Sequence, residues 1–179
     1  EQIAIMDKQY SEQELYLESE WAYSVKSKLS ARLGKIAREY GSLSELDSKL
    51  ISTTLRGTYH ESTKLRFDAQ LWQRPFFIID PSTLYVVAKG GRFDATWYGA
   101  EKTQLRAFLF GQKVNKIPVA KLLTGADRSD TTLRAGLIFQ HEFQPSLRLV
   151  ADGFYERLRQ TEGLPSLRQY ALRMALEYN

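Results

Sequence analysis

The sequence predicts an all-β fold, built from antiparallel strands that follow one another up and down as hairpins. Apolar and polar residues alternate with a period of two through most of the chain, as they do in strands with one apolar and one polar face. Short polar clusters interrupt this alternation at places that suit hairpin turns. The unit of strand, short turn and strand also repeats along the chain, which indicates a modular architecture.

The clearest hairpin covers residues 133–159. Leu133 to Phe143 alternate between apolar and polar side chains, and so do Leu147 to Tyr155. Between them, Gln144 to Ser146 have the composition of a turn, with Pro145 at its centre. The segment therefore predicts two long antiparallel strands.

The same unit occurs in three earlier segments, residues 21–32, 55–66 and 93–106. In each, an alternating strand leads into a few polar residues, then a Leu with a nearby Arg, then a second alternating strand. Four leucines that follow the turns recur about every 40 residues, the length that two strands, a short turn and a longer connection need: Leu29, Leu65, Leu105 and Leu147.

At the N-terminal end, residues 15–25 alternate well and predict a strand. Residues Ser27 to Tyr40 are ambiguous, because Ala, Arg, Leu and Glu favour a helix and Gly34 interrupts them. Their apolar residues also have helical spacing: Leu29, Leu33, Ile36 and Tyr40. The flanking repeat favours a strand, and a helix remains the alternative.

In the middle of the chain, prolines and glycines mark the interruptions. Arg74-Pro75 and Asp80-Pro81 predict a connection, because proline is excluded from central ladder positions. Gly90-Gly91 predicts a kink, bulge or turn. The strands predicted in this part are residues 51–60, 65–72, 84–89 and 93–98.

The last part of the chain predicts two longer connections, at residues 115–130 and 160–166. Ile3 to Met6 predict the tail of one further strand. The remaining strands are residues 105–112, 133–143, 147–159 and 170–178. We therefore expect a single domain, residues 1–179, with about eight to ten strands in this chain.

The composition excludes several kinds of site. The 179 residues contain no cysteine, which excludes disulfides, thiolate metal sites and cysteine nucleophiles. His60 and His141 belong to different hairpins, give no metal-ligand spacing and lack the setting of a catalytic histidine. No Gly-rich phosphate loop or paired-carboxylate motif is present. We therefore expect no enzyme activity, no catalytic residue, no metal and no cofactor.

Charge and hydropathy narrow the class further. The net charge is +4, but the charges are interleaved by sign and form no basic block, so we expect no nucleic-acid partner. The longest uncharged apolar string, Phe76 to Ile79, is too short for a membrane helix. A mean hydropathy of −0.39 still suits a membrane barrel, which presents only every second residue to lipid. Because hydrocarbon cannot satisfy sheet edges, we expect an up-and-down transmembrane β-barrel.

The end of the chain, Arg173 to Asn179, resembles the C-terminal insertion signal of bacterial outer-membrane proteins. In that signal a polar residue, a small residue two positions later and two aromatic residues are read by the barrel-assembly machinery. Arg173, Ala175 and Tyr178 match the polar, small and first aromatic positions, and the last aromatic has no counterpart. The resemblance implies a location in the bacterial outer membrane, with outer-membrane lipid and the barrel-assembly machinery as partners.

The turn sequences of residues 96–106 and 143–148 resemble those of β-barrel porins associated with exopolysaccharide export. They are also similar to the barrel sheaths of extracellular electron-transfer conduits. The resemblance implies a porin-like channel for export or passage of anionic solutes or polysaccharide, in a larger membrane complex. Members of the family are generally longer, so two alternatives stay open: the chain is a complete small barrel, or it is the C-terminal part of a larger one.

The polar positions of the strands are expected to face the barrel interior. The arginines among them are candidates for binding: Arg32, Arg56, Arg66, Arg106, Arg134, Arg148 and Arg173. The other charged candidates are Glu18, Glu20, His60, Asp68, Asp94, Glu142, Asp152 and Glu156. Two interpretations remain open. The arginines form a basic collar that favours anionic solutes, or they pair with the acids in a network that holds a narrow barrel together.

Aromatic residues near the short turns are expected to anchor the barrel at the periplasmic interface: Trp21, Tyr23, Tyr59, Trp97 and Tyr98. A soluble α+β module is the alternative to a barrel. It would combine a helical hairpin, Glu12 to Leu55, with an antiparallel sheet, Leu65 to Arg159, and would bind nucleic acid or a protein partner. Its binding face would carry Arg56, Arg66, Arg106, Arg134 and Arg148, with Phe108 and Phe110 interleaved.

Overall fold

The structure, a computed structural model, describes residues 10–40, 47–76, 83–100, 102–118, 128–160 and 166–178. All regular secondary structure in these ranges is β-strand. The strands are β1 (Tyr10–Ser24), β2 (Ser27–Tyr40), β3 (Ser48–His60), β4 (Leu65–Phe76), β5 (Thr83–Ala100), β6 (Thr103–Pro118), β7 (Arg128–Gln144), β8 (Leu147–Gln160) and β9 (Leu167–Tyr178). The described ranges contain no helix with the length and apolar content needed to cross a membrane.

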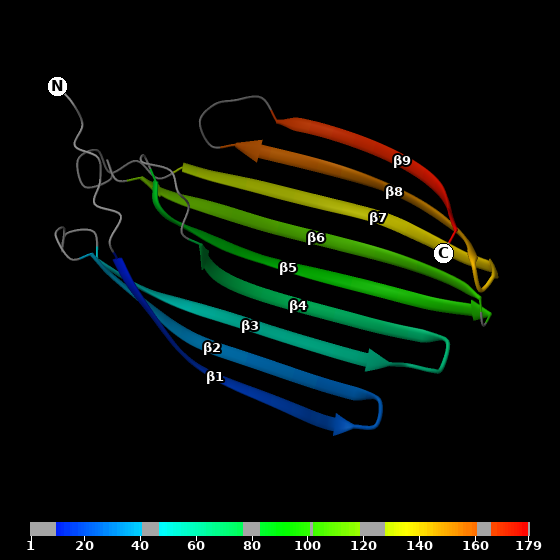
Figure 1. The fold of residues 1–179 in the computed structure, drawn as a ribbon, viewed down its shortest axis with the longest axis horizontal. Coiled ribbons are helices and arrows are strands. Elements are labelled where there is room, and N and C mark those ends of the chain that lie inside the picture. Colours follow the sequence, from blue (N-terminus) through cyan, green and yellow to red (C-terminus); the bar gives the residue numbers. More distant parts are fainter. Residues whose placement is uncertain are drawn as a thin grey trace.

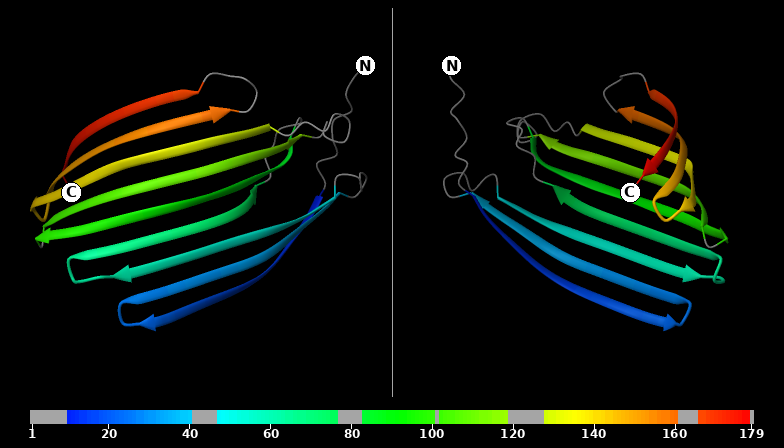
Figure 2. Two further views of the ribbon diagram at one scale, coloured as in Figure 1. Left: turned by 180° about the vertical axis from the view of Figure 1, so that it is seen from behind. Right: turned by 45° about the vertical axis from the view of Figure 1, so that its right-hand side comes forward.

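Each strand pairs with the next in antiparallel fashion, so the nine strands form one sheet in chain order. The described sheet is curved and open, with β1 and β9 at its edges (Figures 1 and 2). Short turns such as Val25-Lys26 and Pro145-Ser146 join strands at one end, and longer connections join them at the other. The predicted all-β, up-and-down fold and its strand number are confirmed.

The ambiguous segment Ser27–Tyr40 is a strand, β2, between β1 and β3. Leu33 is opposite Leu17 on one side and Thr53 on the other. Pairing with two neighbours satisfies the backbone groups of the segment, and this tertiary arrangement prevails over its helix propensity. The alternative helical hairpin from Glu12 to Leu55 is therefore wrong.

Two predicted interruptions lie inside strands. Gly90 and Gly91 continue β5 in regular pairing with β6, so the predicted kink, bulge or turn is wrong. Pro75 belongs to β4 and pairs with β5, whereas the pairing of β4 with β3 ends at Gln73. One side of the ladder is open at Pro75, which is where a residue without an N–H group is tolerated.

The connection predicted at residues 115–130 is shorter than expected, because β6 reaches Pro118 and β7 begins at Arg128. Lys116 and Asp130 form an ion pair across this extension, with 3.0 Å between Nζ and Oδ2. The predicted strand tail at Ile3 to Met6 lies outside the described residues.

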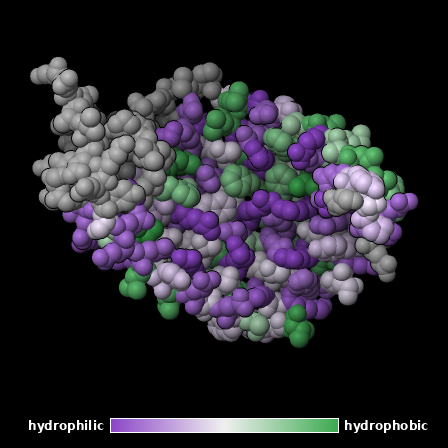
Figure 3. Space-filling model, viewed as in Figure 1, coloured by the Kyte–Doolittle hydropathy of each residue, from purple (hydrophilic) through white to green (hydrophobic). Residues whose placement is uncertain are grey.

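The strand register places the polar residues of all nine strands on the same face of the sheet. Directly opposed residues of an antiparallel pair share a face. The even-numbered residues of β1 to β8 and the odd-numbered residues of β9 therefore form one surface, the polar face. It carries every Asp and Glu of the strands except Glu39. This face is turned toward the viewer in Figure 3, where hydrophilic residues predominate across the sheet.

The opposite surface, the apolar face, is the exposed one. Leu71 and Leu109 are each 59% exposed and Leu172 is 87% exposed. The hydrophobic side chains that are buried among the described residues all lie on the polar face instead: Val86, Ala88 and Val150. The polar face is therefore the crowded inner side of the curved sheet, and nothing in the described chain covers the apolar face.

The apolar face changes in composition along the strands. Four of the predicted girdle residues lie on it, exposed, near the short turns: Trp21, Tyr23, Tyr59 and Trp97. Tyr98 is opposite Gln104 on the polar face, so its assignment to an outer girdle is wrong. Toward the longer connections the apolar face carries cations, which we call the basic row: Lys35, Lys49, Lys89, Lys113, Arg157, Arg159 and Arg168.

Glycine makes room for close packing at one position of the polar face. A Cβ atom on Gly136 would lie 2.6 Å from the carbonyl oxygen of Gly153 and 2.8 Å from the ring of Phe108. A backbone atom and an aromatic ring would both have to shift. Gly57 is different, because the nearest atom to a Cβ there is Leu29 Cδ1 at 3.9 Å.

We predict that Gly136→Ala destabilises the sheet by about 1–3 kcal/mol through overpacking. The matched variant Gly57→Ala should be neutral or slightly stabilising, because alanine restricts the unfolded chain and meets no clash. Equilibrium urea unfolding followed by circular dichroism measures both. Equal transition midpoints for the two variants would show that Gly136 has no packing role.

Candidate functional site

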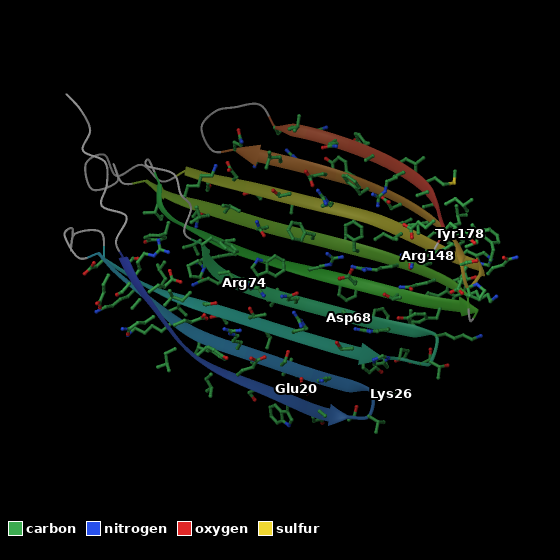
Figure 4. The ribbon with its side chains drawn as sticks, in the orientation of Figure 1. Glu20, Lys26, Asp68, Arg74, Arg148 and Tyr178 are labelled. Atoms are coloured by element: carbon green, nitrogen blue, oxygen red, sulfur yellow. The ribbon has the colours of Figure 1, made fainter. Side chains whose placement is uncertain are left out.

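The charged polar face is the candidate functional site. The structure places all the predicted interior residues on it, including the seven candidate arginines on β2, β3, β4, β6, β7, β8 and β9. Figure 4 marks Glu20 on β1, Asp68 and Arg74 on β4 and Arg148 on β8, which are spread across this face. Whether these residues bind a ligand stays a prediction.

Asp94 of β5 is the centre of the densest charge cluster. It is only 8% exposed. Arg92 Nε donates to Oδ2 at 2.7 Å and Arg92 Nη2 to Oδ1 at 2.9 Å. Arg106 Nε of β6 donates to Oδ1 at 2.7 Å. Two guanidinium groups therefore compensate one largely buried carboxylate.

A second acid lies next to this cluster, because Asp68 of β4 is directly opposite Asp94. Like charges at directly opposed positions destabilise a sheet. Arg66 Nη2 donates to Asp68 Oδ1 at 2.7 Å and Thr58 Oγ1 donates to the same oxygen at 2.8 Å. Arg66 and Thr58 offset the repulsion locally, so the two acids depend on their arginines.

Elsewhere the candidate arginines pair with acids on neighbouring strands. Arg173 Nε and Asp152 Oδ1 are 2.7 Å apart at directly opposed positions of β9 and β8. Arg32 Nη2 and Glu14 Oε1 are 3.1 Å apart on β2 and β1. Two further pairs occupy directly opposed positions: Arg134 with Glu156, and Arg148 with Glu177.

Arg56 of β3 is the exception among the seven candidates. It is opposite Ser30 on one side and Gln70 on the other. It forms no ion pair within the described ranges. An exposed guanidinium group without a carboxylate partner is available to an anion from solution.

Arg56 lines a recess of about 600 Å³ at the short-turn end of β1 to β4, which we call the basic recess. Its other basic residues are Lys26, Lys28, His60 and Arg66. Glu20 is the acid in its lining, and Lys28 Nζ lies 2.8 Å from Glu20 Oε1. Positive charge therefore exceeds negative charge there, unlike in the paired network farther along the strands.

Aromatic rings lie among the arginines of the polar face. The guanidinium carbon of Arg32 is 3.9 Å from the ring centroid of Tyr16, and that of Arg134 is 4.6 Å from the ring centroid of Phe154. Trp72 and Phe110 face each other with 5.7 Å between ring centroids. The face can therefore offer both charge and flat apolar surface to a solute.

Some members of the network are not among the residues predicted from the sequence. Arg92, Arg38 and Glu12 are as closely involved as the candidates, and Arg38 Nη2 lies 2.7 Å from Glu12 Oε2. Their positions follow the same even-numbered alternation, which would have identified them. Lys28 of the basic recess follows the same alternation on β2, whereas Lys26 lies in the turn before it, where alternation gives no signal.

The two histidines lie on opposite faces of the sheet. His60 lines the basic recess. His141 lies on the apolar face, with its Nδ1 atom 2.9 Å from Thr103 Oγ1. No group of three or more His, Asp or Glu residues in the described ranges is arranged to hold a metal ion.

Comparison of the sequence with known proteins found no match. No protein family matches the sequence, and no curated protein matches it either.

We predict that Asp94→Asn destabilises the sheet by about 1–3 kcal/mol, because two guanidinium groups lose their carboxylate. Glu20→Gln is the matched control, since the Lys28–Glu20 pair is exposed on both sides and such pairs contribute little. The shift of the urea midpoint measures both variants. An Asp94→Asn midpoint equal to that of Glu20→Gln would show that the cluster does not stabilise the sheet.

Proposed function

We propose that this chain forms the wall of a bacterial outer-membrane β-barrel that acts as a porin-like channel. The polar face lines the interior and the apolar face contacts lipid. Anionic solutes or acidic polysaccharide pass along the interior, and the protein has no catalytic role. The observation that carries the proposal is the separation of the two faces across all nine strands.

Exposure of the apolar face supports contact with lipid. Large exposed apolar patches on proteins mark binding or membrane surfaces. Here the exposed residues run across the whole sheet, from Leu17 at 73% to Leu176 at 64%. The acids lie on the other side, apart from Glu39. A hydrocarbon solvent on one face and water on the other accounts for both distributions.

The stagger of the hairpins supports a tilted barrel wall. One row of directly opposed residues runs from Leu17 on β1 to Thr131 on β7. Leu17 is eight residues from the turn residue Val25, whereas Thr131 is fourteen residues from Pro145. The turns therefore shift by about one residue per strand, which corresponds to a strand tilt of about 35°. Figure 1 shows the short turns stepping progressively along the sheet.

The height of the apolar band supports a membrane span. On β3, Tyr59 lies near the short turn and Lys49 of the basic row lies ten residues away on the same face. At ~3.3 Å per residue and the tilt of about 35°, ten residues rise by about 27 Å, close to the ~25 Å height of the apolar band in outer-membrane barrels. Aromatic residues at one boundary and cations at the other suit the two interfaces.

The edges of the sheet imply further pairing in a membrane. The outer edges of β1 and β9 have no strand partner in the described chain. Hydrocarbon cannot satisfy unpaired backbone groups, so these edges pair with one another or with further strands of a larger barrel. Arg173, Ala175 and Tyr178, which resemble the insertion signal, lie on β9 at one of these edges. We expect the barrel-assembly machinery to engage this strand.

The polar face suits an anionic solute. The basic recess supplies unpaired positive charge at the end where the short turns lie. Arginines and aromatic rings alternate beyond it, and guanidinium groups pair with carboxylates while rings pack on sugar faces. The paired charges elsewhere on the face hold the wall rigid and leave Arg56 as the binding candidate best suited to a passing anion.

Leu137 and Ile138, neighbours on β7, test the membrane orientation. Leu137 is 56% exposed on the apolar face, whereas Ile138 is opposite Asp152 on the polar face. We predict that Leu137→Arg lowers the stability of the protein in lipid by about 2–4 kcal/mol, because it places a charge in hydrocarbon. Ile138→Arg should cost less, because the new cation stays on the polar face, between Arg106 and Asp152, and does not enter hydrocarbon.

The measurement is folding of the full-length protein into lipid vesicles under urea titration, read by the mobility of unheated samples on a denaturing gel. A water-soluble protein would tolerate Leu137→Arg at an exposed site. Equal tolerance of the two variants, or failure of the wild type to enter vesicles, would overturn the proposal.

Arg56 and Lys49, which lie on opposite faces of β3, test the route of the solute. We predict that Arg56→Gln lowers the preference of the channel for anions, because it removes an unpaired cation from the interior. Lys49→Gln removes the same charge from the apolar face and should leave the preference unchanged. The reversal potential in a potassium chloride gradient across a planar bilayer distinguishes them, and equal shifts would contradict an interior lined by the polar face.

A further inference from the structure

The apolar face carries two pairs of like charges at directly opposed positions. Lys89 of β5 is opposite Lys113 of β6, and Arg157 of β8 is opposite Arg168 of β9. None of the four forms an ion pair with another described residue. Like charges in this position destabilise a sheet. An anion from outside the chain would relieve the repulsion.

A hollow lies beside the two lysines on the same face. Gly91 and Gly111 are directly opposite each other, with Leu71 and Leu133 on their outer sides. A Cβ atom on Gly91 would lie 2.9 Å from Leu71 Cδ2 and one on Gly111 would lie 3.2 Å from Leu133 Cδ2, so the two leucine side chains border a shallow recess at the glycines. The resulting recess, the glycine groove, has a volume of about 570 Å³ and an almost entirely apolar lining.

The lysine pair and the glycine groove are consecutive positions of the same two strands. Gly91 follows Lys89 by two residues, and Gly111 precedes Lys113 by two. Two residues along a strand correspond to about 7 Å. Arg157 is opposite Leu133, one wall of the groove, and adds a third cation beside it.

We propose that this part of the apolar face binds an anionic lipid, with the lipid phosphate between Lys89 and Lys113 and an acyl chain in the glycine groove. The inference rests on the proposed membrane location, because the apolar face meets lipid only there. It names a specific partner for one site on that face. The basic row lies at the boundary of the apolar band, which is the depth of lipid headgroups.

Charge and shape together favour a lipid as the occupant. A free phosphate would contact the lysines and leave the groove unfilled. An uncharged apolar molecule would fill the groove and leave the lysines unbalanced. A lipid with a phosphate headgroup meets both requirements with one molecule.

The experiment is native mass spectrometry of the full-length protein in detergent micelles, titrated with phosphatidylglycerol or phosphatidylcholine. We expect the wild type to retain phosphatidylglycerol in preference to the zwitterionic lipid. The double variant Lys89→Gln/Lys113→Gln should bind phosphatidylglycerol about tenfold or more weakly, because each basic residue contributes to attraction of an anionic headgroup. Inorganic phosphate at the same concentration should not displace the lipid.

A matched double variant, Lys35→Gln/Lys49→Gln, removes the same charge from the basic row on β2 and β3, away from the glycine groove. It should retain the lipid as the wild type does, and an equal loss in both double variants would overturn a specific site. Gly111→Leu should weaken binding with both lysines intact. If that variant does not fold, Gly111→Ala replaces it, since its Cβ would lie 3.2 Å from the flexible end of Leu133.

Failure of this inference is distinguishable from failure of the proposed function. A wild type that does not enter membranes contradicts both. A wild type that enters membranes but retains the two lipids equally, or releases phosphatidylglycerol to inorganic phosphate, contradicts the lipid site alone. Wild-type retention by a folded Gly111 variant would show that the groove holds no acyl chain.

Discussion

The cross-strand register is the constraint on which this structure depends. Because side chains alternate along a strand, a slip of one residue between two strands would move a whole set of charges to the other face. The register is continuous from β1 to β9, and it keeps the strand acids, apart from Glu39, on a single face. Separation of a polar and an apolar surface follows directly from this pairing.

The two faces differ in whether their cations have acid partners. On the polar face cations and acids sit side by side, and the opposed acids Asp68 and Asp94 are compensated by arginines from three strands. On the apolar face the basic row has no such partners within the described chain. The inner charges compensate one another, whereas the cations of the basic row have no acid partner among the described residues, and for two of them we propose a lipid phosphate.

Glycines allow close packing on the polar face and lie in a recess on the apolar face. On the polar face Gly136 admits the ring of Phe108, and Gly90 lies where a Cβ would meet Trp72 at 2.7 Å. These glycines allow aromatic rings to pack closely on the crowded inner surface. On the apolar face the opposed Gly91 and Gly111 lie in the glycine groove, bordered by the side chains of Leu71 and Leu133. Adjacent positions of one strand thus contribute to a packed inner surface and to a recess on the outer one.

Alternation along the sequence by itself predicted most of the strands, their approximate number and the face on which most residues lie, because a period of two is a local property of each strand. It placed Arg56 and Asp94 on one face without reference to any partner. Only the tertiary structure decided what each residue meets, because strand pairing joins residues far apart in the chain. It made Ser27–Tyr40 a strand between two others, kept Gly90-Gly91 within β5 and turned Tyr98 inward. It also paired six of the seven candidate arginines with acids while leaving Arg56 open, and aligned the scattered cations of the apolar face into one row.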